Sequence, residues 1–270
     1  MSKNKLYSIT VSVSDITPSQ RKEMFSVFEK YYSNSSYSTF CKDLVSKDTV
    51  FLLLDSRENI IRGFSTIVNL NYVTKGGKSH RGVFSGDTII EKEFWGQGAL
   101  GVAFLKYLFI QKLKRPFSPL YWYLISKGFK TYLLMANNFD EHWPRFEQET
   151  PALKKELING FSNIMYPENF DSKSGLIMFP DEECKDALKF GIAPITKKLK
   201  DENQRVNFFD TTNPNWQKGD ELCCLASMTL TMPIKYQMKI MKKSYHKILA
   251  IHKQRVLALF GISSIGRNGK

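Results

Sequence analysis

The sequence is poor in the residues that mark secreted or metal-binding proteins. It has four cysteines in 270 residues, and they show no metal-ligand spacing. Two of them, Cys223 and Cys224, are adjacent, so in a strand they point to opposite faces and cannot readily bridge each other. With Cys41 and Cys184, we expect them to be reduced, buried thiols in a protein of the cytoplasm.

Long apolar runs and targeting signals are also missing. No run reaches the roughly 18 apolar residues of a membrane-spanning helix, and the opening residues, MSKNK, lead into a strand pattern without an apolar signal region. The four histidines show no paired metal spacing, and no Gly-x-Ser-x-Gly elbow, P-loop or Cys-x-x-Cys occurs. With 42% hydrophobic and 24% charged residues, the chain is expected to form one large globular domain, or a domain with additions.

Residues 82–113 carry the most informative pattern. A β-branched run ends in the segment WGQGALG (residues 95–101), and an apolar, helix-patterned segment follows at once. A strand, a glycine-rich turn and a helix in this order direct backbone N–H groups and a helix N-terminus at one position, which binds phosphate. A side chain in place of Gly96 or Gly98 would block the approach of a ligand to the backbone.

This segment resembles the acyl-CoA-binding motif of the GNAT superfamily of N-acyltransferases, Arg/Gln-x-x-Gly-x-Gly/Ala, between the fourth strand and the third helix of that fold. Two registers fit this sequence. Glu93-x-x-Gly96-x-Gly98 keeps both small positions, whereas Trp95-x-x-Gly98-x-Leu100 loses the last one. Neither register supplies the leading Arg or Gln.

The elements around the motif follow the order of that fold over about residues 6–145. Apolar runs between turn residues predict strands, and Thr17, Pro18 and Gln20 form a capping box that opens a helix. Strands are expected at residues 7–13, 49–55, 60–70, 81–91 and 128–137, and helices at 17–32, 36–46, after residue 98 and, as an extra apolar helix, at 120–127.

The second half of the chain predicts additions to this core. Helices are expected at 151–161 and 181–189, a loop at 166–175, and the last two strands of the sheet at 205–209 and 221–230. The predicted parts are a GNAT-like acyl-CoA-binding core (1–145), a helical and loop insertion or cap over the acceptor side (146–204), the last core strands (205–232) and a basic amphipathic helix (233–270). The expected fold class is α/β, with a mixed, mostly antiparallel sheet flanked by helices.

The resemblance implies transfer of an acyl group from acyl-CoA, acetyl-CoA or an acyl carrier protein to an amine acceptor. The amine must lose a proton to attack, and the thiolate must leave protonated. Asp87 and Glu91 on the fourth strand and His142 past the fifth are the candidate bases, and Tyr132 and Tyr123 are the candidate acids. A structural role at a strand edge, at the surface or in the core is the competing interpretation for each.

The same resemblance implies a binding site for the cosubstrate without a metal. Backbone amides of the fourth strand polarise the thioester carbonyl, the glycine loop binds phosphate, and Asn137 or Asn138 ends the fifth strand. The residues expected to bind the cosubstrate are Ile89, Ile90, Trp95, Gly96, Gln97, Gly98, Ala99, Leu100 and Asn137.

Positive charge is concentrated in residues 233–270. They hold nine Lys and Arg and no Asp or Glu, which leaves +4 of the formal +13 on the first 232 residues. Apolar residues recur there at helical spacing. Three interpretations stay open: a helix packed on its own core, a helix lying on anionic membrane, and a dock for an acidic partner such as an acyl carrier protein, a second subunit or nucleic acid. Nucleic acid is the least favoured partner, because no nucleic-acid-binding motif accompanies the charge.

A function of a different class also fits the sequence. A GNAT-shaped protein without catalysis would act as a binding module through its basic helix, on a membrane or on an acidic partner. The missing Arg or Gln favours this alternative, whereas the Gly96-x-Gly98 turn favours the enzyme. Either protein is expected in the cytoplasm or at the periphery of a membrane, and a homodimer is compatible with both.

Overall fold

The computed structural model describes residues 4–32, 36–179 and 194–232, together with residues 234, 235, 238 and 241. The chain divides into two compact units, Met1–Leu230 and Thr231–Lys270. In the second unit the described residues from 232 onward are helical. The rest of the predicted basic helix, the helix predicted at 181–189 and Cys184 lie outside the described residues. The predicted divisions near residues 145 and 204 stay predictions.

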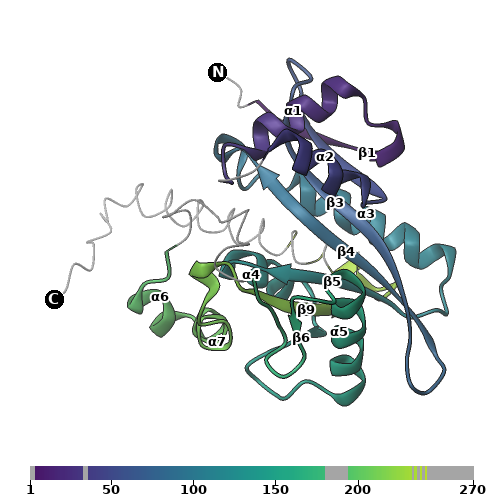
Figure 1. Cartoon of the computed structure of the whole chain (residues 1–270), viewed down its shortest axis with the longest axis vertical. Helices are drawn as coiled ribbons and strands as arrows, with labels where there is room; N and C mark the ends of the chain where they lie inside the picture. The colour runs from purple at the N-terminus through teal and green to yellow at the C-terminus, as the bar shows by residue number, and fades with distance from the viewer. Residues whose placement is uncertain are drawn as a thin grey trace, which may run out of the picture. The chain divides into compact units, whose positions relative to one another are not determined.

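A mixed sheet forms the centre of the first unit (Figure 1). Its strands follow the order β1-β2-β3-β4-β5-β9-β8-β7, and β6 pairs with β9. All of these pairs are antiparallel except β4 and β5, which are parallel. The strands are β1 (Leu6–Ser12), β2 (Thr49–Asp55), β3 (Ile61–Val73), β4 (Ser79–Ile90), β5 (Leu120–Ser126), β6 (His142–Trp143), β7 (Phe170–Asp171), β8 (Leu176–Ile177) and β9 (Glu221–Ser227).

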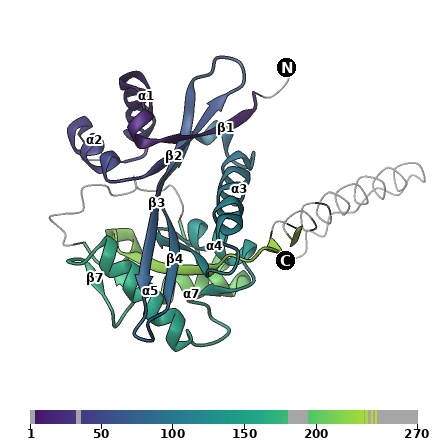
Figure 2. The ribbon, with the colours of Figure 1, turned by 90° about the vertical axis from the view of Figure 1, so that its right-hand side faces the viewer.

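Helices cover both faces of this sheet. Figure 2 shows α1 and α2 on one side of β1–β3 and α3 on the other side. The expected fold class, a mixed and mostly antiparallel sheet flanked by helices, is confirmed. The helices are α1 (Pro18–Phe28), α2 (Tyr37–Val45), α3 (Ala99–Lys114), α4 (Phe129–Asn138), α5 (Ala152–Met165), α6 (Lys197–Glu202) and α7 (Gln204–Thr212), with 3-10 turns η1 (Val13–Asp15), η2 (Lys92–Phe94) and η3 (Trp216–Lys218).

The burial of β2 shows why its sequence is a continuous apolar run. Neighbouring residues of a strand point to opposite faces. Leu52 belongs to the core cluster of α1 and α2 that contains Phe28 and Phe40, whereas the ring of Phe51 packs edge-on against Phe104 of α3 with centroids 6.1 Å apart. Both faces of the strand are therefore buried, and no polar alternation is possible.

The predictions for the two elements that follow α3 are wrong: the expected helix is a strand, and the expected strand is a helix. Residues 120–127 form strand β5 rather than a helix, and residues 128–137 lie in helix α4 rather than in a strand. The segment LYWYLIS of β5 is buried on both faces, and such a run has no period that separates a strand from a buried helix. In α4 the buried residues are Phe129, Tyr132, Met135 and Ala136, which share one helical face.

The strand predicted at 205–209 is also wrong, because these residues lie in α7. Asn203 caps this helix by accepting hydrogen bonds from the backbone N–H groups of Arg205 and Val206. Val206 and Phe209 then place their side chains on one buried face, three residues apart. The short apolar run at 205–209, which predicted a strand, instead supplies the buried face of helix α7. The strand predicted at 221–230 is present as β9.

The predicted capping box at the start of α1 is present and supplies a test of local stability. The Thr17 hydroxyl accepts a hydrogen bond from Gln20 N (3.2 Å), and Thr17 N donates to Gln20 Oε1 (2.9 Å). Replacing Thr17 with Ala should lower the free energy of unfolding by about 1 kcal/mol in urea denaturation. Ser19→Ala, which removes an exposed hydroxyl from the same helix, should leave it unchanged. Equal effects of the two variants would contradict the role of the cap.

Candidate active site

The parallel ladder between β4 and β5 ends early. In the described part of the chain the two strands pair from Arg81↔Leu120 to Ser85↔Leu124. Beyond this point β4 continues beside β3 to Ile90, and β5 continues beside β9. From Gly86 onward, β5 no longer covers this edge of β4. An exposed strand edge is a place where an extended ligand can hydrogen-bond to the backbone.

A β-bulge marks the point of separation. Ser65 pairs with Thr88 and Ile67 pairs with Ser85, so Gly86 and Asp87 together oppose the single residue Thr66. A Cβ atom at position 86 would lie 2.5 Å from Thr66 Oγ1, so a side chain there would have to displace the Thr66 hydroxyl. On the other face, Trp122 Nε1 donates to Ser85 Oγ at 2.8 Å. These contacts fix Ser85↔Leu124 as the last pair of the β4–β5 ladder, and the bulge changes the direction of the backbone at Asp87.

The glycine-rich loop joins the end of β4 to α3. Gly96 and Gly98 have φ angles of 80° and 79°, which side chains rarely adopt, and no atom lies within 4 Å of a Cβ built at either position. Gly98 is the N-cap residue of α3, and no side chain caps this helix within the described residues. The N–H groups of its first turn and its helix dipole therefore point to an open position suited to an anion.

Two side chains of the loop anchor it to the body of the protein. Trp95 Nε1 donates to the Ile90 carbonyl at 2.7 Å. The Gln97 amide bonds to the N-terminal strand region, since its Oε1 accepts from Leu6 N at 2.9 Å and its Nε2 donates to the Asn4 carbonyl at 3.0 Å. Gln97 therefore holds the loop in place, and the loop offers its backbone to a ligand.

A lysine that the sequence did not single out lies beside this loop. Lys130, in the first turn of α4, is exposed, and its Nζ is 5.2 Å from the centroid of the Trp95 ring. The motif lacks the leading Arg or Gln of the GNAT pattern, and Lys130 brings a positive charge to the same region from another element. The wrong strand prediction for residues 128–137 concealed it, because only the helix turns Lys130 toward Trp95.

A second group, the Tyr166 cluster, consists of Asp87, Lys127, Tyr166 and Glu221. Burial raises the pKa of Tyr166 well above its usual value, and the carboxylates of Glu221 and Asp87 raise it further. The Tyr166 ring packs edge-on against Phe84 of β4, with centroids 6.2 Å apart. Lys127 Nζ lies 3.3 Å from Glu221 Oε1. Tyr166 therefore keeps its proton at neutral pH, as a general acid must.

Sequence reasoning named Asp87 as a candidate base and did not single out Tyr166. Tyr166 follows α5 in a segment that reads as a loop, and nothing in that local pattern links it to β4. The link is made by the fold, which packs α5 on the same face of the sheet as Phe84.

Glu91, another predicted base, lies directly after β4 and is buried. Its carboxylate is hydrogen-bonded to the Lys30 ammonium, and its Oε2 lies 3.5 Å from Arg62 Nη1. Its backbone N–H donates to the Arg62 carbonyl at 2.8 Å. The structure places Glu91 in an ion-pair network between the end of α1 and β3.

His142 and Tyr132 lie together. Their ring centroids are 6.4 Å apart. Nδ1 of His142 donates to the Phe139 carbonyl at 3.0 Å, and the Tyr132 hydroxyl donates to the Pro144 carbonyl at 3.2 Å. Burial raises the pKa of Tyr132, with a further effect of Cys224.

The two tyrosines lie on opposite faces of the sheet. The pKa of Tyr132 responds to Cys224, whereas that of Tyr166 responds to Cys223. Cys223 and Cys224 are neighbours in β9 and therefore point to opposite faces of the sheet. Tyr166 lies on the face of Cys223, and Tyr132 lies on the face of Cys224. Tyr123 lies on the Cys223 face, with its hydroxyl 2.8 Å from Ser162 Oγ and fully buried.

The remaining predicted binding residues lie on several different elements. Ile89 points into the core of α1 and α2, while its neighbour Ile90 accepts the Trp95 bond. Ala99 and Leu100 form the first turn of α3. Asn137 lies in α4 rather than at a strand end, and its Oδ1 accepts a hydrogen bond from Arg205 Nη1 at 2.7 Å.

The buried histidine predicts a pH dependence of stability. Burial lowers the pKa of His142, so below about pH 6.5, the unfolded value, the unfolded chain binds a proton that the folded chain does not. The contribution of neutral His142 to the free energy of unfolding is therefore complete above this pH. It falls as the pH decreases, by at most about 1.4 kcal/mol per pH unit. His142→Asn keeps a donor for the Phe139 carbonyl and should flatten this decline.

Urea denaturation of wild type and variant at pH 7.5, 6.5 and 5.5 measures the difference. Burial also lowers the pKa of His80, so part of the acid sensitivity should remain in the variant. Parallel curves for the two proteins would show that His142 does not contribute.

Among known proteins, similarity was found only to solved structures. No protein-family model and no curated protein matches the sequence. A probable N-acyltransferase from Enterococcus faecalis matches with a TM-score of 0.37 and 15% identity, over 52% of this chain and 37% of that one. An acetyltransferase from Trypanosoma brucei has a TM-score of 0.36 and 13% identity, over 54% of this chain and 100% of that one.

A third match is a GNAT family N-acetyltransferase from Escherichia coli, solved in complex with CoA. Its TM-score is 0.34 and its identity 14%, over 50% of this chain and 69% of that one. Within the described residues, no group of three or more His, Cys, Asp or Glu could hold a metal ion. No helix in that part of the chain is long and apolar enough to cross a membrane.

Proposed function

We propose that this protein transfers an acyl group from a CoA or carrier-protein thioester to an amine. The observation that carries the proposal is the end of the parallel ladder at Ser85↔Leu124. Among the described residues, this leaves the edge of β4 beyond Ser85 without a β5 partner, directly before the glycine-lined N-terminus of α3. An anionic, extended and thioester-bearing molecule uses both features, because its phosphates require N–H donors and its amide-bearing arm requires a strand edge.

The donor end of the site is positively polarised. Backbone N–H groups of residues 96–100 and the dipole of α3 favour phosphate, and Lys130 adds a mobile positive charge. Because Lys130 is exposed, salt screens its contribution, and the fixed backbone donors supply the geometry. The positive φ angles of Gly96 and Gly98, which side chains rarely adopt, explain why the loop has glycine there.

The reacting end lies at the bulge and the Tyr166 cluster. A substrate thioester carbonyl along residues 86–90 is polarised by backbone N–H groups of β4. Asp87 or Glu221 accepts the proton of the attacking amine, directly or through water. The nitrogen bonds to the carbonyl carbon, the carbon–sulfur bond breaks, and Tyr166 returns a proton to the departing thiolate. The raised pKa of Tyr166 keeps it in the required protonated form.

Ligand-induced thermal stabilisation tests the donor. A ligand that binds only the folded state adds about 2.7 kcal/mol to stability when present at 100 times its Kd. CoA, acetyl-CoA and longer acyl-CoAs should each raise the melting temperature, and a shift that grows with chain length would identify the acyl class. No shift with any of them would exclude CoA and leave a carrier protein or a non-catalytic role.

Lys130→Met should weaken CoA binding about three- to tenfold, since it removes one partly screened charge from the phosphate position. Lys114→Met is the matched control. It makes the same charge change at the other end of α3, about 20 Å away for a helix of this length, and should leave binding unchanged. Equal affinities of the two variants would remove Lys130 from the site.

Tyr166→Phe should lower kcat by about a hundredfold and change KM little, because the hydroxyl acts only when the thiolate leaves. Release of free CoA from acetyl-CoA in the presence of a panel of primary amines measures both constants. Tyr107→Phe removes a hydroxyl of α3 that donates to Asn69 Oδ1 at 3.1 Å and should retain full activity. An unchanged kcat in Tyr166→Phe would show that the proton comes from elsewhere.

A further inference from the structure

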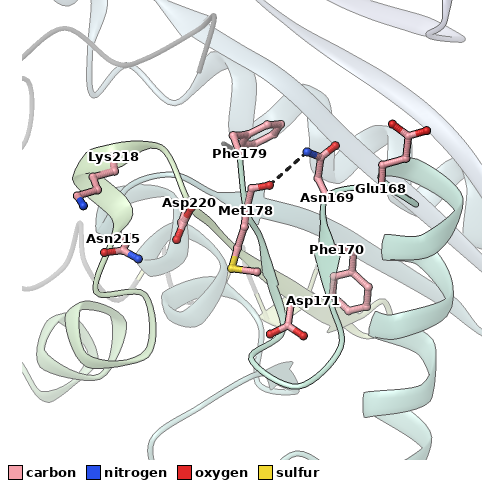
Figure 3. A pocket seen from close by; sticks show the side chains of 9 residues that line it. All are labelled: Glu168, Asn169, Phe170, Asp171, Met178, Phe179, Asn215, Lys218 and Asp220. Atoms are coloured by element: carbon pink, nitrogen blue, oxygen red, sulfur yellow. Dashed lines mark hydrogen bonds between the residues drawn. The ribbon is translucent and has the colours of Figure 1, made fainter. Parts of the chain in front are cut away.

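A groove of about 580 Å³ lies at the end of the sheet formed by β7, β8 and β9 (Figure 3). One wall is the β7–β8 hairpin, with Phe170, Met178 and Phe179. The other wall is the connection from α7 to β9, with Asn215 and Asp220. The size lies within the range of sites for small organic ligands.

Asp220 is the residue that gives the groove its chemistry. It is only 6% exposed, and no described residue donates a hydrogen bond to its carboxylate or forms an ion pair with it. Its backbone carbonyl accepts from Asn213 Nδ2 at 2.8 Å, which fixes the loop. Figure 3 shows the carboxylate between Asn215 and Met178. The carboxylate lines the groove and has no partner among the described residues, so a cation in the groove would be favoured.

The rest of the lining agrees with a positive ligand. Asp171, whose pKa is lowered by hydrogen bonds from the Ser174 hydroxyl and nearby backbone N–H groups, stays ionised at neutral pH. Glu168 adds a third carboxylate at the rim. Lys218 is the one cation among the residues that line the groove, and Figure 3 shows its ammonium directed away from Asp220. This negative groove occurs on a chain whose formal charge is +13.

The apolar wall specifies an organic cation rather than a bare ion. Phe170, Met178 and Phe179 offer two aromatic rings and a thioether to alkyl groups. The Lys127 ammonium already lies 6.0 Å from the centroid of the Phe179 ring, so this ring accepts a cation on its surface. The ladder pairs Ile177 with Glu221, which places Met178 beside Asp220 just beyond it. Apolar surface and carboxylate are thus adjacent.

We propose that this groove binds a linear aliphatic amine, with one ammonium on the Asp220 carboxylate and its alkyl chain along Phe170 and Met178. A diamine or polyamine fits best, because its second ammonium can reach the carboxylates of Asp171 or Glu168. This binding site does not depend on acyl transfer and would exist in a protein without that activity.

Isothermal titration of the full-length chain with 1,6-diaminohexane, in the absence of any acyl donor, tests the site. The diamine should bind, its affinity should fall as salt is raised, and the uncharged 1,6-hexanediol should not bind. Asp220→Asn should weaken binding about tenfold or more, as expected when a charge-assisted hydrogen bond is lost. Asp201→Asn, which makes the same charge change on exposed α6 away from the groove, should bind within about twofold of wild type.

A gain-of-function variant keeps the test decisive if Asp220→Asn does not fold. Asn215 is exposed on the same wall, and Asn215→Asp should tighten diamine binding severalfold by adding a carboxylate. Circular dichroism melts confirm that each variant is folded. Absence of diamine binding to wild type, equal binding of the diol, or wild-type affinity in a folded Asp220→Asn would each overturn the proposal.

Discussion

The separation of β4 from β5 after Ser85 is the constraint around which the first unit is arranged. A central strand of a sheet normally has ladder partners on both edges, and loss of one leaves polar backbone groups that require another environment. Here the bulge at Gly86 and Asp87 and the Trp122–Ser85 hydrogen bond fix where the separation begins. Each strand then follows its other neighbour, and the glycine loop and α3 begin where β4 ends.

The charges around this point are sorted by face. The α3 N-terminus and Lys130, which favour anions, belong to the layer of α3 and α4. Asp87 and Glu221 belong to the other face, with Tyr166. The edge of β4 lies between the two layers. An anionic ligand and a cationic ligand can therefore approach the same backbone segment from opposite sides, each attracted by one side and repelled by the other.

The sequence predicted the first half of this fold well, because its elements have clear periods and local stop signals. The capping box at Thr17, the long hairpin of β3 and β4, and the glycine turn before α3 are each specified within a few residues. β5 was predicted as a helix and α4 as a strand, because the β5 segment LYWYLIS is buried on both faces and shows no hydrophobic periodicity. That exchange concealed Lys130. Tyr166 and Asp220 could not be predicted, because their partners and their burial come from segments distant in sequence.

The Gln97 amide joins two regions that have separate roles. Its bonds to Asn4 and Leu6 tie the geometry of the glycine loop to the start of β1. We therefore expect opening of β1 from the sheet edge to loosen the loop as well, and amide exchange of the two segments to be coupled. Any change that frays the start of β1 would then reduce the order of a loop more than ninety residues away along the chain. A ligand held by that loop would in turn protect β1.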